Sequence, residues 1–258
     1  MSESGDRQAE STRGGILTQI GLAASFLTIL PILNDRPRSP AAVAASFRWF
    51  PLIGFALGGL LWLEDWAAGA FMGPSARAIM AVMTLAIVTG AVHLDGLADT
   101  ADALGAGRDR ERALAIMRDS RIGTFGAVAI VFLLLLKVSA LAGATANHRR
   151  AALYLAPGLA RWAMVMVAER MDYLRREGAG TELLAQNDRR SLLIASALAA
   201  VGTIVAWSIA AIGAATVAVT LALLLRLVYR RWLGGVTGDL LGAAGEIVET
   251  AVMIAVCA

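Results

Sequence analysis

The stretch AIMAVMTLAIVTGAVHLDGLADTAD, residues 78–102, joins an uncharged apolar run to three aspartates. The run covers residues 78–92, and it can cross a membrane only if it extends into its flanks, because a span needs about 17 residues or more. Asp95, Asp99 and Asp102 follow it at spacings i, i+4 and i+7. Clustered carboxylates at the mouth of a membrane helix are costly unless a cation neutralises them. The stretch therefore indicates a membrane protein with a cation site.

Composition supports a membrane protein along the whole chain. The 258 residues are 58% hydrophobic and 17% charged, whereas soluble domains are about 45–50% apolar and about 25% charged. We expect an all-α fold, a polytopic integral membrane bundle of seven or eight helices. The apolar runs cover residues 16–33, 50–63, 78–92, 125–146, 151–168, 192–212, 214–228 and 240–258. Residues 1–14 are expected to form a disordered tail, and residues 15–258 a single transmembrane helical domain.

The arginines predict the orientation of the spans. The net charge of +3 comes with 22 arginines and one lysine. Strict alternation of the spans brings four arginine-rich segments, near residues 36–48, 108–121, 170–190 and 226–231, to one side. The positive-inside rule makes that side cytoplasmic. This distribution accounts for the basic charge without a nucleic-acid partner.

The three aspartates form the first candidate site. On a helix that turns about 100° per residue, they fall within roughly 60° of one another. Their oxygen ligands suit Mg²⁺ or Mn²⁺. The alternative is a helix end with solvated acids. His93 would lie near the opposite face, so we rank it below the aspartates and expect it to bind substrate.

A second candidate site is Arg118-Asp119-Ser120-Arg121, which directly precedes the fourth apolar run. Arginine guanidinium groups match phosphate oxygens, and the backbone amides at a helix N-terminus also favour anions. Asp119 could complete the metal site. The alternative is an ordinary arginine-rich cytoplasmic loop.

Charged residues also occur inside the later apolar runs. Lys137 and Arg161 lie in the fourth and fifth runs, where a cation needs an anionic substrate or an acid within the membrane. Asp239, Glu246 and Glu249 share one helical face near the C-terminus. The two glutamates should point into the protein. Asp239 could instead be a helix N-cap.

Three segments together resemble the cobalamin synthase family, the adenosylcobinamide-GDP ribazoletransferases. They are His93-Leu-Asp-Gly-Leu-Ala-Asp-Thr-Ala-Asp102, Met117-Arg-Asp-Ser-Arg-Ile-Gly-Thr-Phe-Gly126, and Gly234-Gly-Val-Thr-Gly-Asp239 with the glutamates that follow. Weaker similarities occur at Phe50-Pro-Leu-Ile-Gly54, at Arg161-Trp162, and at Tyr173 with Arg175. The chain departs from the family pattern at Ile29, where arginine is common, and at Asp172-Tyr-Leu-Arg175, where the family tends to show Pro-Tyr-Ala-Arg.

The resemblance implies the final joining step of cobalamin assembly at the bacterial inner membrane, with the active site facing the cytoplasm. A ribose hydroxyl of α-ribazole, or of its 5′-phosphate, would attack adenosylcobinamide-GDP and release GMP. These two substrates and the lipid bilayer are the expected partners. A homo-oligomer, or a complex with other cobalamin-assembly enzymes, is compatible with this role.

The residues receive the following roles as a hypothesis. Mg²⁺, or Mn²⁺, is assigned to Asp95, Asp99, Asp102 and Asp119. Catalysis is assigned to Asp99, Asp102, Arg118, Arg121 and Lys137. Substrate binding is assigned to His93, Arg48, Arg161, Ser120, Asp239 and Glu246. The cations would neutralise charge on phosphate oxygens, and Asp99 or Asp102 would accept the proton of the attacking hydroxyl.

Three other functions compete with this one. A cation-coupled transporter would also use charged residues within the membrane, but transporters more often contain internal repeats, and we find none. A lipid phosphotransferase of the CDP-alcohol type would carry an arginine that is absent from the aspartate motif. A membrane scaffold would not need phosphate-type motifs in two separate loops.

The alternating topology can be tested by labelling. Cysteines introduced at Asn34 and Arg108 should react with a membrane-impermeant thiol reagent from the same side, because both positions fall in arginine-rich segments. Reaction from opposite sides of the membrane would contradict the alternation of spans.

Overall fold

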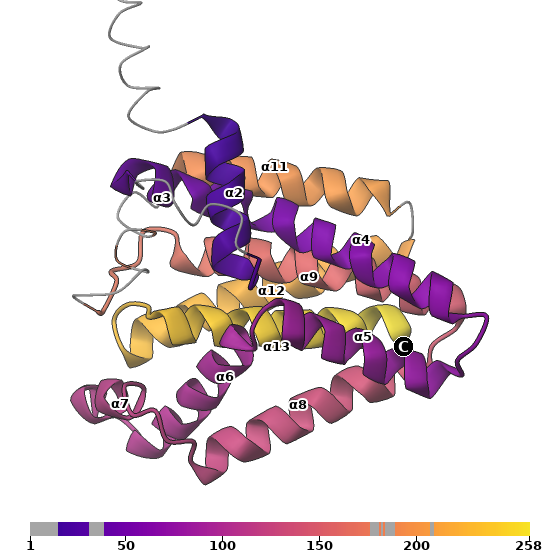
Figure 1. Cartoon of the computed structure of the whole chain (residues 1–258). Coiled ribbons are helices and arrows are strands. Elements are labelled where there is room, and N and C mark those ends of the chain that lie inside the picture. Colours follow the sequence, from indigo (N-terminus) through magenta and orange to yellow (C-terminus); the bar gives the residue numbers. More distant parts are fainter. Residues whose placement is uncertain (1–14, 31–38, 176–180, 182, 184–188, 207–208) are drawn as a thin grey trace, which may run out of the picture.

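The computed structural model describes residues 15–30, 39–175, 181, 183, 189–206 and 209–258 (Figure 1). Within these ranges the chain is helical, and its one β-type pairing is an isolated bridge between Tyr173 and Val236. The all-α prediction is confirmed. The tail predicted for residues 1–14 and the labelling position Asn34 lie outside the described residues.

The helices follow the apolar runs in order. The N-terminal part contains α2 (Ile16–Leu27), α3 (Pro40–Ser46), the 3₁₀ turn η1 (Phe47–Trp49), α4 (Phe50–Ala68) and α5 (Pro74–Val88). The middle contains α6 (Val92–Ala103), η2 (Leu104–Ala106), α7 (Arg110–Ile116) and α8 (Thr124–Gly143). The C-terminal part contains α9 (Ala146–Ala168), α11 (Arg189–Val205), α12 (Ile209–Trp232) and α13 (Gly238–Cys257).

Five helical segments in the described part of the chain are long and apolar enough to cross a membrane. They are Pro40–Ala68, Thr124–Gly143, Ala146–Ala168, Ala210–Trp232 and Gly238–Cys257. A sixth span results if the bent pair α5–α6 is counted as one. The first apolar run gives only the 12-residue helix α2, which at about 18 Å is shorter than the hydrocarbon core of about 30 Å.

Helix α9 lies at the centre of the bundle and packs against α4, α11, α12 and α13 (Figure 1). In the most apolar 18-residue stretch of each helix, the buried share is 83% for α9 and 72% for α13, but 22% for α8 and 22% for α12. The first two helices therefore form the protein interior. The last two present apolar side chains outward, as lipid-facing helices do.

Two glycines allow α4 and α9 to pack closely. A Cβ atom added at Gly54 would lie 2.8 Å from Gly158 Cα, and one added at Gly58 would lie 2.9 Å from Tyr154 Cα. Real Cβ atoms do not approach other atoms this closely. Small residues at such crossings let membrane helices gain backbone contact without a hydrophobic driving force.

The stretch that contains the aspartate motif is not one continuous helix. The chain breaks after Val88, and α5 and the following helix are bent by 89°. Gly90 and Ala91 have φ values of +61° and +55°, in the left-handed region that ends a right-handed helix. The Ile29 backbone N–H donates to the Val88 carbonyl at 2.9 Å. The expectation of aspartates at the mouth of the preceding membrane helix is therefore corrected: they lie on a separate helix, α6.

A buried ionic network joins four helices. Lys137 of α8 donates to Glu246 at 2.6 Å and to Glu249 at 2.5 Å, both on α13. Arg161 of α9 donates to Glu249, and its other terminal nitrogen lies 3.3 Å from Nδ1 of His93 on α6. All five residues are at most 5% exposed. Two cations and two carboxylates balance, which meets the condition for burying charge in a membrane protein.

This network predicts a large effect of Lys137→Met on stability. The substitution leaves Glu246 and Glu249 with one buried cation between them, and breaking a buried pair typically costs about 3–5 kcal/mol. We expect a clear loss in denaturant or thermal unfolding of the protein in detergent micelles. Arg110→Met, at an exposed position of α7, is the control. Equal stability of the two variants would contradict the structural role of Lys137.

Candidate functional site

Three loops converge at one end of the bundle, where α8 and α13 begin and α9 ends (Figure 1). The Trp232 indole N–H donates to the Gly107 carbonyl at 3.0 Å. The Arg175 guanidinium donates to the Met117 carbonyl at 2.9 Å. Segments that are arginine-rich and far apart in the sequence thus share one end of the molecule, as the alternation of spans predicts.

Helix α6 crosses the start of α13 at very short range. A Cβ atom at Gly96 would lie 2.8 Å from the Asp239 carbonyl oxygen, and one at Gly242 would lie 3.2 Å from His93 Cα. Both glycines are needed for this approach, because a larger residue would separate the two helices. The contact fixes the aspartate motif against the second acidic segment.

The close crossing gathers acidic side chains. Asp99 is half-buried, and the charged groups that act on it are Asp95, Asp239, Arg175 and Asp102. Asp95, one turn earlier on α6, is exposed. The structure therefore brings Asp239 to the predicted triad. Four carboxylates with one arginine leave an excess of negative charge, which favours a cation at this point.

Asp239 does not cap its helix. Thr237 is the N-cap of α13, and its hydroxyl accepts the Leu240 N–H at 3.2 Å. Asp239 lies in the first turn, where it accepts hydrogen bonds from Arg175 and, at 3.2 Å, from the Thr237 hydroxyl. The alternative of an N-cap role for Asp239 is wrong. Arg175 holds this carboxylate towards α6.

Asp102 has a capping role that its spacing did not predict. Its two carboxylate oxygens accept the backbone N–H groups of Gly123 at 2.7 Å and of Gly126 at 2.9 Å. Gly123 is the N-cap of α8 and Gly126 lies in its first turn, and a glycine N-cap has no side chain to accept such a bond. Both carboxylate oxygens of Asp102 are thus already engaged by backbone amides. Asp99 is therefore the better candidate for the general base.

The Arg118–Arg121 loop is exposed and lies directly before α8. The Asp119 carboxylate accepts the Arg121 backbone and guanidinium N–H groups, which lowers the pKa of Asp119 to about 2. Asp119 is therefore ionised and already paired. Asp119 can bind a metal ion, as predicted, only after Arg121 releases this carboxylate and binds another anion instead. Arg118 and Ser120 are open to solvent.

Other predicted site residues lie in the bundle core. Lys137, Arg161, Glu246 and His93 form the buried network, so the charged residues within the membrane face one another. Lys137 is 2% exposed, which argues against its predicted contact with phosphate. Arg48 lies in η1, which packs against α2, α4 and α11. Its role in substrate binding stays a prediction.

Arg175, Tyr173 and Thr237 carry little signal in the sequence. Arg175 and Tyr173 belong to a segment that departs from the family pattern. In the structure, Tyr173 forms the bridge to Val236 beside the start of α13. Burial raises the pKa of the Tyr173 phenol, which therefore stays protonated at neutral pH. The carboxylate that pairs with Arg175 is Asp239, which is distant in the sequence, so only the folded structure identifies this pair.

The donor set fits Mg²⁺ as a metal shared with a substrate. Within the described ranges, no group of three His, Cys, Asp or Glu side chains forms a ready metal cage. Mg²⁺ in proteins is usually held by one or two carboxylates together with substrate phosphates. Asp95 and Asp99, one helical turn apart with Asp239 opposite, offer that arrangement.

Comparison with known proteins agrees with the motif placement. A family model described as cobalamin-5-phosphate synthase matches residues 19–257. A protein of Syntrophobacter fumaroxidans named adenosylcobinamide-GDP ribazoletransferase is 41% identical over 92% of this chain and 97% of its own length. Proteins of the same name from a Roseiflexus species and from Escherichia coli are 38% and 36% identical. They cover 91% and 80% of this chain, and 87% and 85% of their own lengths.

No solved structure matches the chain. The family match covers nearly the whole sequence, and the three motifs that carry it meet at one end of the bundle. The chain belongs to the cobalamin-5-phosphate synthase family.

Proposed function

We propose that this protein catalyses the last step of nucleotide-loop assembly in cobalamin biosynthesis. A ribose hydroxyl of α-ribazole, or of its 5′-phosphate, attacks the cobinamide-linked phosphorus of adenosylcobinamide-GDP. A new P–O bond forms, the bond to the bridging oxygen breaks, and GMP leaves with the bonding electrons. The names of the relatives support this reaction. The meeting of the α6 aspartates with Asp239 beside a loop of phosphate-binding type is the observation that carries the proposal.

Asp95 and Asp99 hold the divalent cation in this proposal. They lie one turn apart on α6 at the open end of the bundle, where a pyrophosphate can complete the coordination. When bound by these residues, Mg²⁺ or Mn²⁺ would supply positive charge to the pyrophosphate and to the leaving group. Asp119 can join this set once its arginine binds phosphate.

The neighbouring residues bind and orient the substrates. Arg118 and Arg121 bind phosphate oxygens, with Ser120 beside them, at the start of α8. Asp99 is half-buried among acids and accepts the proton of the attacking hydroxyl. Asp102 positions the loop through its two amide bonds, and Arg175 positions Asp239.

The site faces the cytoplasm of a bacterial inner membrane in this proposal. Support comes from the arginine-rich loops that gather around it, since such loops stay on the cytoplasmic side. Assembly with further copies or with other cobalamin-assembly enzymes is compatible with this orientation, and lipid covers the outward faces of α8 and α12.

Asp99 and Asp95 of α6 should each be needed for the full rate of the reaction. With adenosylcobinamide-GDP, α-ribazole and Mg²⁺, we expect Asp99→Asn to lower GMP release by about 10²–10⁴-fold, the contribution of a positioned proton acceptor. Asp95→Asn should raise the Mg²⁺ concentration that gives half-maximal rate. Glu111→Gln, an exposed acid of α7 at the same end, serves as the control. Full rates for both variants would refute the proposed metal site, and no GMP from well-folded native protein would refute the reaction.

Asp102 should behave differently from Asp95. Asp102→Asn turns an amide N–H towards a backbone N–H of α8, and loss of such a cap costs about 1 kcal/mol. We expect a lower kcat, a lower unfolding temperature, and an unchanged Mg²⁺ dependence. A shifted Mg²⁺ dependence would instead identify Asp102 as a metal ligand.

A further inference from the structure

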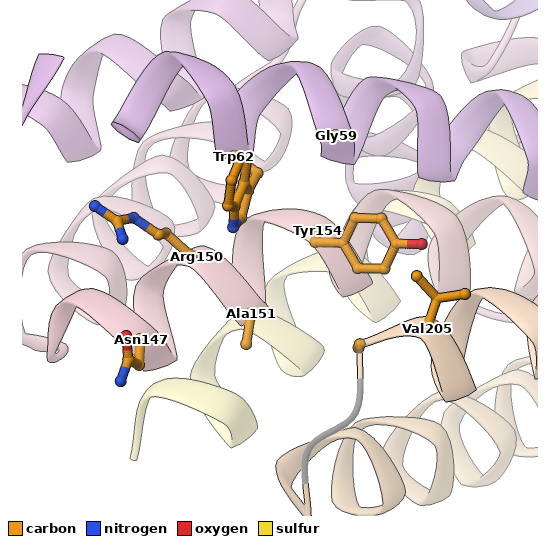
Figure 2. Close-up of a pocket in the computed structure, with 8 residues that line it drawn as sticks. Gly59, Trp62, Asn147, Arg150, Ala151, Tyr154 and Val205 are labelled. Atoms are coloured by element: carbon orange, nitrogen blue, oxygen red, sulfur yellow. The ribbon is translucent and has the colours of Figure 1, made fainter. Parts of the chain in front are cut away.

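A second hollow lies at the end of the bundle opposite the aspartates. It has a volume of about 500 Å³ and is bounded by α4, the start of α9 and the end of α11 (Figure 2). Trp62, Asn147, Arg150 and Tyr154 are among the side chains that line it. None of them belongs to the candidate catalytic site.

The charges beside this hollow do not balance. The Asp65 carboxylate is fully buried and pairs with Arg77, with Arg149 at 2.8 Å and with Arg150 at 3.3 Å. Glu64, the next acid along α4, accepts a hydrogen bond from Thr84 of α5 at 2.8 Å. Three guanidinium groups therefore surround one carboxylate, which leaves a positive excess.

Arg150 is the arginine of this cluster that lines the hollow. Its side chain is 27% exposed, whereas those of Arg77 and Arg149 are 8% and 3% exposed. The two buried arginines also bind backbone carbonyls, Arg77 that of Asp65 at 2.7 Å and Arg149 that of Ala144 at 3.2 Å. Arg150 contacts Asp65 through Nε, and within the described residues its terminal nitrogens have no hydrogen-bond partner that would compete with an anion.

The walls of the hollow are suited to a lipid. Trp62 and Tyr154 lie beside it, and Trp66, one turn after Trp62 on α4, is 58% exposed. Tryptophan and tyrosine gather where membrane and water meet. Arg150 lies four residues into α9, about 6 Å from its start. The arginine is thus at headgroup depth, and the aromatic and aliphatic walls continue towards the hydrocarbon.

We propose that this hollow binds a phospholipid with an anionic headgroup. Arg150 binds the phosphate, whose negative charge is not offset by a choline in an anionic lipid. The Asn147 amide donates a second hydrogen bond, and an acyl chain lies along Trp62 and Tyr154. A free phosphate compound would share the ionic contact but would leave the apolar walls uncovered. The site is separate from the catalytic end, and its occupation stabilises the contact of α4 with α9.

The test measures thermal unfolding of the full-length protein in neutral detergent micelles. Micelles doped with phosphatidylglycerol should raise Tm by about 2–4 °C, whereas phosphatidylcholine and inorganic phosphate should leave it unchanged. Arg150→Gln should lose most of this rise. Arg110→Gln, at an exposed position on the opposite end, should keep it.

Arg150 also contacts Asp65, so Arg150→Gln changes the buried ion pairs as well as the hollow. A second variant therefore alters the hollow alone. Asn147→Leu leaves the arginines around Asp65 intact and should reduce the rise in Tm produced by phosphatidylglycerol. An equal rise with phosphatidylcholine would overturn the preference for an anionic headgroup. An equal rise with inorganic phosphate would overturn the lipid. A full response in both variants would overturn the site itself.

Discussion

Two glutamates buried inside a membrane bundle impose the condition on which the rest of the structure depends. Glu246 and Glu249 are acceptable there only because Lys137 and Arg161 reach them from α8 and α9. These ion pairs form only when α8, α9 and α13 lie at one position along one another, so they fix the relative register of the three helices. His93 extends the same contacts to α6 through Arg161. The ionic core therefore sets the position of the helix that carries the aspartates.

Two further contacts turn that position into a site. Gly96 and Gly242 let α6 lie directly against the start of α13, which brings Asp239 to the aspartates. Asp102 then holds the first turn of α8, so that the arginine loop begins beside the same acids. Each contact joins segments that are far apart in the sequence. Aspartates that look equivalent in the sequence thereby have different partners: Asp102 binds amides of α8, and Asp239 binds Arg175.

The sequence predicted those features that depend on local periodicity or on the cost of burying charge. The apolar runs predicted the long helices, the spacing of Asp95 and Asp99 predicted that they share one side of a helix, and the depth of Glu246 predicted an interior position. The bend at Ala91 was missed, because alanine favours helices and one adjacent glycine is a weak break signal. The capping role of Asp102 and the partner of Arg175 depend on tertiary contacts, which spacing alone does not encode.

The bend between α5 and α6 also has a consequence for biogenesis. The Val88 carbonyl at the bend accepts a hydrogen bond from the Ile29 N–H. Ile29 follows α2, which the ribosome has already produced when the bend emerges. Helix α6 also rests on α13 through Gly96 and Gly242, and α13 is synthesised after all the middle helices. The acidic cluster therefore cannot assemble during translation of the middle helices. A nascent chain that has not yet reached α13 would enter the bilayer with this cluster still incomplete.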